Sequence, residues 1–302
     1  MVIDMTQNHD AFSRCTPAVN FIFFLFAIVF GVIFLHPAYL CVSVLGAVLF
    51  YLTRKGKRGV RQVLAFLPLF AIVSLLNPLL NTQGTHVLFT VFGRPYTREA
   101  LYYGMAMGGM FISVLVWFLC YNEIMTSDKF TSLFGNLIPA LSLLLVMILR
   151  LVPAYQRKAE QISGARRCVG KSAAANAPLR ERIASGMTIL SAMTSWALES
   201  SIVTADSMRS RGYGAAKRTT FRIHRFGTRD ALLLACILPL AAVVIIAAAM
   251  GATSASFTPE LILAPVRGFS AAALAAYALL LLIPTLLNLW EALTWRILRS
   301  KI

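Results

Sequence analysis

The residues best suited to chemistry lie between Ala205 and Gly214, which read ADSMRSRGYG. We expect a long helix to run into this stretch and to end at Gly212, because glycine adopts the left-handed conformation that closes a helix. Arg209 and Arg211 then lie in the last turn, near the partial negative charge of the carbonyl end. Exposed arginine side chains donate paired hydrogen bonds to carboxylate and carbonyl oxygen atoms. The expected chemistry is therefore recognition of another surface.

Residue patterns for covalent or metal-assisted catalysis are not found. The sequence has no phosphate-binding glycine loop, no metal-binding histidine pair and no nucleophile elbow. The five cysteines are scattered singly, without the spacing of a disulfide framework or a zinc site. Glu199 and Asp206 lie seven residues apart, on about the same face of a helix. These two acids either form a proton or cation site or pair with nearby arginines. We favour the pairing. We expect no catalytic residue, metal or cofactor.

The composition indicates an integral membrane protein. Of 302 residues, 58% are hydrophobic and only 13% are charged, against about 25% charged in average soluble domains. A soluble core of this size could not bury so many apolar side chains. The net charge of +16 is arranged in blocks beside apolar runs. That arrangement is typical of cytoplasmic loops facing anionic lipid and does not favour nucleic acid as a partner.

Apolar runs predict about six membrane-spanning helices, of which the second is the shortest. A seventh run, Leu137–Leu149, stops at Arg150 and Pro153, so it lies along the membrane or belongs to a further span. The number of membrane-spanning helices therefore ranges from five to eight. The six runs are Ala18–Leu35, Ala38–Leu52, Val63–Leu80, Leu101–Tyr121, Ala231–Met250 and Phe269–Trp290.

Basic loops set the orientation. Residues 54–61 contain five basic residues and no acid, and residues 150–229 contain fifteen Lys and Arg against four acids. The positive-inside rule places both regions, and with them both termini, in the cytoplasm. We expect three parts: a membrane domain of four spans at 1–121, two long helices at the cytoplasmic face at 122–229, and two spans with a basic tail at 230–302.

Details within the runs predict local features. Pro68 and Pro78 predict kinks in the third span. The loop from residue 81 to 98 is rich in β-branched and aromatic residues, which favours a small hairpin or an interfacial segment. Gly104, Gly108 and Gly109 in the fourth span permit close helix packing. These glycines form either an internal helix contact or a partner-facing groove.

The stretch Trp196–Gly214 resembles the signature of the transmembrane T component of energy-coupling factor (ECF) transporters. Its residues Ser207, Met208, Ser210, Arg211, Gly212 and Tyr213 follow the order of that signature. The stretch 150–170 is similar to the end of the family's first coupling helix. That end usually reads Ala-Arg-Gly, whereas this chain has Cys168, Val169 and Gly170. Either Arg166 or Arg167 serves in place of the missing arginine, or the ends of the two coupling helices make unequal contacts with their partners.

The resemblance implies an all-helical scaffold in the inner membrane of a bacterium or archaeon. In the family, two coupling helices dock into two ATP-binding-cassette ATPase subunits, which hydrolyse ATP and drive uptake of a vitamin or other micronutrient. Residues implied in docking are Ser210, Arg211, Gly212, Arg209, Arg166, Arg167 and Gly170. The hydrophobic faces of the same helices hold a small membrane S component that selects the substrate. Residues implied to face it are Leu144, Met147, Met187, Leu190 and Met193.

Two other functions are open to an apolar membrane protein: a carrier and an intramembrane enzyme. A stand-alone secondary carrier would need ionisable groups inside the membrane, but the predicted spans contain no acidic residue before Glu291, at the end of the last one. An intramembrane enzyme would need a cluster of His, Asp or Glu near one membrane face, and the sequence offers none. Both functions are therefore less favoured than that of a non-catalytic transporter subunit.

Overall fold

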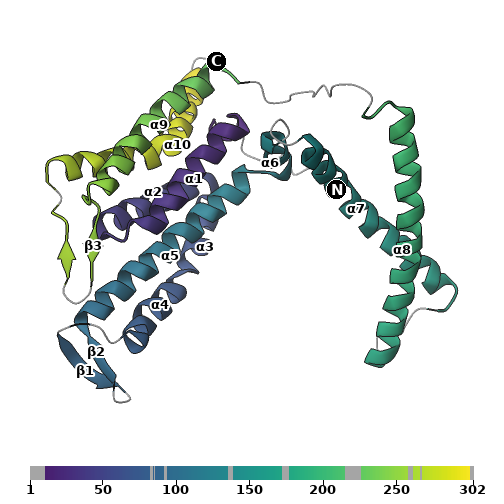
Figure 1. Cartoon of the computed structure of the whole chain (residues 1–302), viewed down its shortest axis with the longest axis horizontal. Coiled ribbons are helices and arrows are strands. Elements are labelled where there is room, and N and C mark those ends of the chain that lie inside the picture. The colour runs from purple at the N-terminus through teal and green to yellow at the C-terminus, as the bar shows by residue number, and fades with distance from the viewer. Residues whose placement is uncertain are drawn as a thin grey trace. The chain divides into compact units, whose positions relative to one another are not determined.

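The computed structural model describes residues 11–81, 84, 86–91, 94–134, 139–171, 177–214, 226–257, 261–265 and 267–299. In this part of the chain, ten helices and two short antiparallel hairpins make up the regular structure (Figure 1). The predicted class, an all-α membrane protein, is confirmed. The chain forms two compact units. Unit 1 is Met1–Phe130 together with His224–Ile302, and unit 2 is Thr131–Ile223.

Among the described residues, five stretches of unit 1 are long and apolar enough to cross a membrane. They comprise α2, α3 with α4, α5, α9 and α10. Helix α1 is apolar but shorter, and α6 leads toward unit 2. The bounds are α1 (Pro17–Ile33), α2 (Pro37–Lys55), α3 (Lys57–Leu64), α4 (Leu67–Leu80), α5 (Arg98–Ile124), α6 (Ser127–Phe134), α9 (Thr228–Ala249) and α10 (Phe269–Arg299).

The first two helices reverse their predicted lengths. Helix α1 has 17 residues and ends at Ile33, before the predicted end at Leu35, whereas α2 has 19 residues. Proline disfavours helical backbone in the residue before it, and His36 is extended, with φ −64° and ψ 127°. Pro37 then begins α2, a position where its missing N–H costs no hydrogen bond. Helix α2 is therefore longer than the run at 38–52 predicted, and α1 is shorter than the run at 18–35 predicted.

The third span is divided into α3 and α4, which are separated by Ala65 and Phe66. Pro68 lies in the first turn of α4, where a helix tolerates proline. Pro78 lies inside α4 and leaves one carbonyl of that helix without its usual backbone donor. The interruption of this span thus falls next to the first of the two prolines.

The main core of unit 1 is aromatic and surrounds Trp117 of α5. Its fully buried indole meets Phe23 and Phe24 of α1 edge-on, with ring centroids 5.7 and 6.3 Å away. It stacks on Phe50 of α2 at 6.4 Å. The indole N–H donates to Ser43 Oγ over 3.2 Å, so the buried ring keeps its polar group satisfied. These contacts join α1, α2 and α5.

Helices α4 and α5 pack closely because glycines lie at their contact. A Cβ atom at Gly104 would lie 2.6 Å from Ser74 O, and one at Gly108 would lie 2.8 Å from a ring carbon of Phe70. A Cβ atom at Gly109 would meet nothing within 4 Å. Gly104 and Gly108 therefore form an internal helix contact and not a partner-facing groove.

The loop between α4 and α5 and the loop between α9 and α10 each contain a hairpin. Strand β1 (Val87–Val91) pairs with β2 (Arg94–Thr97), in agreement with the hairpin interpretation of the loop at 81–98. Strands β3 (Ala255–Ser256) and β4 (Ile262–Leu263) form a second hairpin that was not predicted. Two-residue strands are too short to show the alternation that identifies a strand in a sequence.

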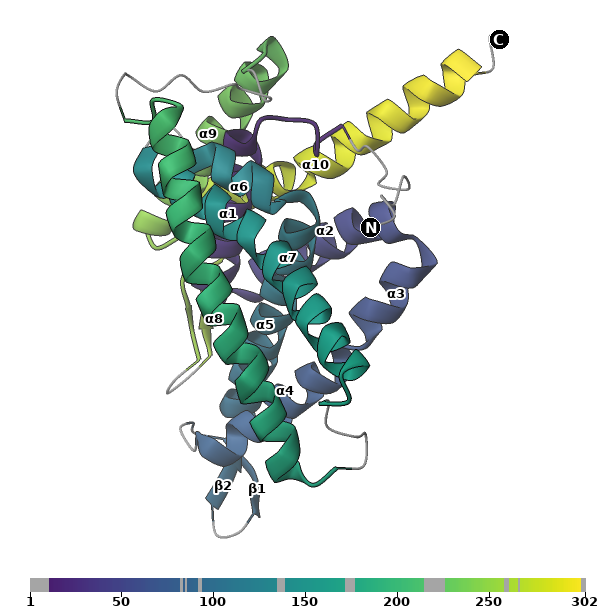
Figure 2. The same ribbon diagram turned by 90° about the vertical axis from the view of Figure 1, so that its right-hand side faces the viewer.

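Unit 2 is built on two long antiparallel helices, α7 (Pro139–Cys168) and α8 (Leu179–Ser210) (Figure 2). The apolar run stops before Arg150, but the helix does not: α7 continues through Arg150 and Pro153 to a length of 30 residues, so apolar and basic stretches share one helix. The carbonyl of Pro153 accepts a hydrogen bond from Arg157 Nε over 3.2 Å. Leu137, the first residue of the predicted apolar run, lies outside the described residues.

Candidate partner-docking site

The α8 end, Met208–Tyr213, closes its helix with two backbone hydrogen bonds. The Tyr213 N–H donates to Met208 O over 3.2 Å, and the Gly212 N–H donates to Arg209 O over 3.0 Å. This pair of bonds is a Schellman motif, and it requires left-handed backbone at Gly212, where φ is 76°. Arg209 and Arg211 remain exposed around this turn.

The α7 end, Arg166–Lys171, closes in the same way. The Lys171 N–H donates to Arg166 O over 2.9 Å, and the Gly170 N–H donates to Arg167 O over 3.0 Å. Gly170 has φ 70°. The second Schellman motif therefore forms although its sequence lacks the arginine before the glycine, because the motif depends on glycine and not on the residue beside it.

Matching the two motifs bond by bond pairs their side chains. Arg167 of the α7 end takes the position that Arg209 takes at the α8 end. Val169, which is 70% exposed, takes the position of Arg211. One arginine position is thus common to both ends, and the second is an arginine only at the α8 end. Aligning the sequence on Gly170 and Gly212 would have found this correspondence.

The Arg166 side chain forms hydrogen bonds within unit 2. Its Nη2 atom donates to Lys171 O over 2.9 Å and to Ser185 Oγ of α8 over 3.3 Å. Arg167 by contrast is exposed. Of the two arginines considered as replacements at the α7 end, Arg166 connects the helices of unit 2 and Arg167 is open to a partner.

The two ends are far apart along unit 2. The α7 end reaches Ser185, close to the start of α8, whereas α8 ends at Ser210, 25 residues after Ser185. At 1.5 Å per residue this separation is about 38 Å. Tyr155 and Trp196 meet between the ends, with ring centroids 5.5 Å apart, and Lys158 Nζ lies 5.5 Å from the indole centroid.

The remaining predicted site residues divide into two groups. At the α8 end, the Ser210 hydroxyl donates to Ser207 O over 2.9 Å and the residue stays exposed. Among the five residues implied to face an S component, three are more than half exposed and two are half-buried. The exposed ones are Leu144, Met187 and Leu190, and the half-buried ones are Met147 and Met193.

Helix α8 presents large apolar side chains on its surface. None of its 32 residues is buried, yet large apolar side chains on it are exposed, at Ile183, Leu198 and Ile202 among others. Soluble monomers rarely expose contiguous apolar surface of this kind, and such surface marks contact with another protein or with lipid. In the described residues, no group of three or more His, Cys, Asp or Glu side chains could hold a metal ion.

Comparison with known proteins gives one informative similarity. No family model matches the chain. Over 188 residues the chain is 26% identical to the energy-coupling factor transporter transmembrane protein EcfT of Staphylococcus aureus (strain 04-02981). The match covers 59% of this chain and 70% of that protein. The chain is therefore similar to a transporter membrane protein, and its described residues include five helical stretches long and apolar enough to cross a membrane.

Proposed function

We propose that this chain is the membrane T component of an ATP-driven ECF importer. The observation that carries the proposal is the pair of matched helix ends, each with an exposed arginine next to a Schellman turn. The similarity to EcfT supports it. On this proposal the chain catalyses no reaction, binds no cofactor, and transmits movement from two ATP-binding-cassette ATPase subunits to a substrate-binding S component.

Each helix end docks into one ATPase subunit. The separation of about 38 Å along α8, at 1.5 Å per residue, allows two partners to bind without sharing a surface. Arg209 and Arg211 serve one subunit, and Arg167 serves the other. Because arginine forms paired hydrogen bonds with carboxylates, acidic grooves on the ATPases are the matching surfaces.

Unit 2 transmits the movement. Arg166 links the α7 end to Ser185, and Trp196 contacts Tyr155 and Lys158 of α7. A displacement at either helix end is therefore passed to the other helix. The exposed side chains of Leu144, Met187 and Leu190 offer the S component an apolar surface, and the S component selects the vitamin or other micronutrient.

The basic segments set the orientation in the cell membrane of a bacterium or archaeon. Residues 54–61 and 150–229 lie in the cytoplasm, where the ATPases are, and both termini lie on the same side. The hairpins β1–β2 and β3–β4 then lie outside.

Affinity purification tests the proposal. The tagged chain is isolated from its own membranes in mild detergent, and the proteins that accompany it are identified by mass spectrometry. We expect two ATP-binding-cassette subunits and a small hydrophobic protein. Recovery of the chain alone, under conditions that keep other membrane complexes intact, would instead favour a self-sufficient carrier.

A further inference from the structure

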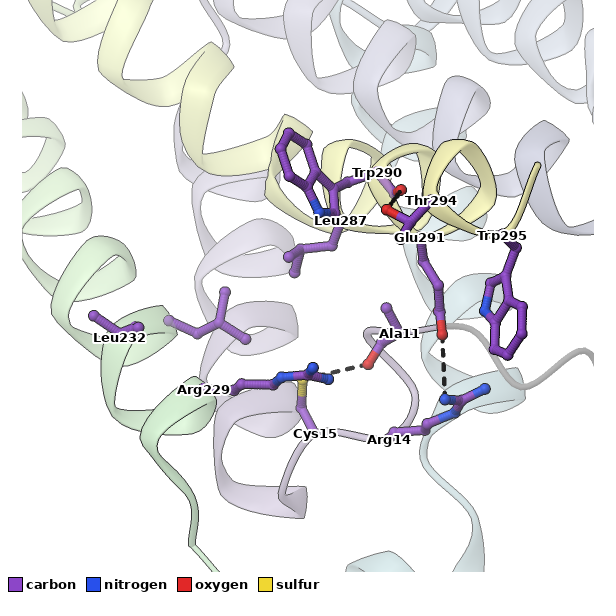
Figure 3. A pocket seen from close by; sticks show the side chains of 11 residues that line it. Ala11, Arg14, Cys15, Arg229, Leu232, Leu287, Trp290, Glu291, Thr294 and Trp295 are labelled. Atoms are coloured by element: carbon purple, nitrogen blue, oxygen red, sulfur yellow. Dashed lines mark hydrogen bonds and ion pairs between the residues drawn. The ribbon is translucent and has the colours of Figure 1, made fainter. Parts of the chain in front are cut away.

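Three segments of unit 1 enclose a groove of about 540 Å³ (Figure 3). They are the loop before α1, the first turns of α9 and the last turns of α10. The volume lies within the range of roughly 300–1,000 Å³ that is usual for small-molecule sites. The groove is lined by Ala11, Arg14, Cys15, Arg229, Leu232, Leu233, Leu287, Trp290, Glu291, Thr294 and Trp295.

One side of the groove has the residue composition of a membrane interface. Leu232, Leu233 and Leu287 give it an apolar wall on α9 and α10. Trp290 is 76% exposed and Trp295 is 54% exposed. Exposed tryptophans at the end of a membrane-spanning helix are typical of the level of the lipid headgroups.

The polar side of the groove has an excess of positive charge. Arg14 and Glu291 form an ion pair of 3.2 Å and offset each other. The Asp230 carboxylate accepts hydrogen bonds from the Thr16 N–H over 2.9 Å and the Gly227 N–H over 3.0 Å, so it is directed at the starts of α1 and α9.

The Arg229 guanidinium points toward Ala11 and Cys15 across the groove (Figure 3). Burial raises the pKa of the Cys15 thiol to about 11, and the nearby Asp230 carboxylate adds to the shift. Cys15 therefore contributes no negative charge at neutral pH. Among the described residues that line the groove, Glu291 is the one carboxylate, and it pairs with Arg14. No described lining carboxylate therefore offsets the charge of Arg229.

The geometry points to a binding site for an anionic phospholipid. The phosphodiester oxygen atoms accept hydrogen bonds from Arg229, and the first part of an acyl chain lies along Leu232, Leu233 and Leu287. The tryptophans flank the glycerol region. A lipid is the matching occupant, and a soluble phosphate is not, because the charged side continues directly into an apolar wall. This site depends on the membrane helices of unit 1 and not on the proposed transport role.

Native mass spectrometry of the full chain tests the site. The purified protein is delipidated and titrated with phosphatidylglycerol or with phosphatidylcholine of the same acyl chains. We expect preferential retention of phosphatidylglycerol. Arg229→Gln should weaken its binding about tenfold, which corresponds to about 1.4 kcal/mol. The matched control is Arg267→Gln, which removes an exposed arginine before the opposite end of α10 and should change nothing.

A second variant separates binding from folding. Leu287→Trp fills the groove but keeps its charges, and it should also expel phosphatidylglycerol while the protein keeps its elution volume and melting temperature. Equal retention of both lipids, or equal binding by Arg229→Gln and Arg267→Gln, would overturn the proposal. So would displacement of phosphatidylglycerol by glycerol 3-phosphate at equal concentration, since that would identify a soluble phosphate as the ligand.

Discussion

Two tryptophans show how differently the two units use the same side chain. Trp117 in unit 1 is fully buried and meets three phenylalanine rings and a serine hydroxyl. Trp196 in unit 2 is half-buried and meets one tyrosine and one lysine. Unit 1 holds itself together through a dense core, whereas unit 2 keeps much of its apolar surface exposed.

The difference separates stability from recognition. A substitution in the core of unit 1 should act on folding, because the lost contacts have no replacement. A substitution at an exposed end of unit 2 should act on partner binding and leave folding intact.

Arg211→Glu should abolish uptake. Reversal of a charge that is paired across an interface costs more than the roughly 2–5 kcal/mol seen when such a charge is truncated. The variant should still insert, keep its melting temperature and hold its S component. Transport of labelled substrate and recovery of ATPase subunits measure the effect. Arg267→Glu is the control, and normal uptake by Arg211→Glu would refute the docking role.

Trp117→Ala should destabilise unit 1 by about 3–5 kcal/mol, the usual cost of removing a buried aromatic side chain. Trp196→Ala should cost about 1 kcal/mol or less, as expected for a half-buried position with few partners. Unfolding of the purified protein in detergent, followed by circular dichroism, compares the two. Equal destabilisation would show that unit 2 has a core of its own.

Arg167→Gln should weaken capture of one ATPase subunit about tenfold, equivalent to about 1.4 kcal/mol, without a change in stability. Adding Val169→Arg should restore capture, because that position matches Arg211 in the second Schellman motif. Binding of the purified ATPases to immobilised protein measures both. Failure of Val169→Arg to rescue would mean that the two ends bind their partners through different contacts.

Gly170→Ala and Gly212→Ala should each fray the last turn of a helix. Left-handed backbone costs a residue with a Cβ atom about 1–2 kcal/mol, and φ is 70° and 76° at these positions. Hydrogen exchange at the Lys171 and Tyr213 amides should speed up accordingly. A Cβ atom at Gly186, inside α8, would meet nothing within 4 Å. Gly186→Ala should therefore stabilise the helix by about 0.5–1 kcal/mol and slow amide exchange there.

Local features were predictable to a useful extent. The apolar runs predicted the helices, and Gly212 predicted the end of α8 to within a residue or two. The α7 helix was predicted in two pieces because Arg150 and Pro153 read as a stop. The error arose because one proline removes a single backbone hydrogen bond, which a helix of 30 residues tolerates.

Local residue patterns specify where most of the helices lie and which glycines end them, because these properties depend on residues within a turn or two. Packing in three dimensions instead decided that Arg166 is held by a contact with Ser185 while Arg167 stays exposed. It also decided that Gly104 and Gly108 face α4 and that Arg229 faces Cys15. These outcomes join residues far apart in the chain, and their partners are chosen by packing, which no local pattern specifies.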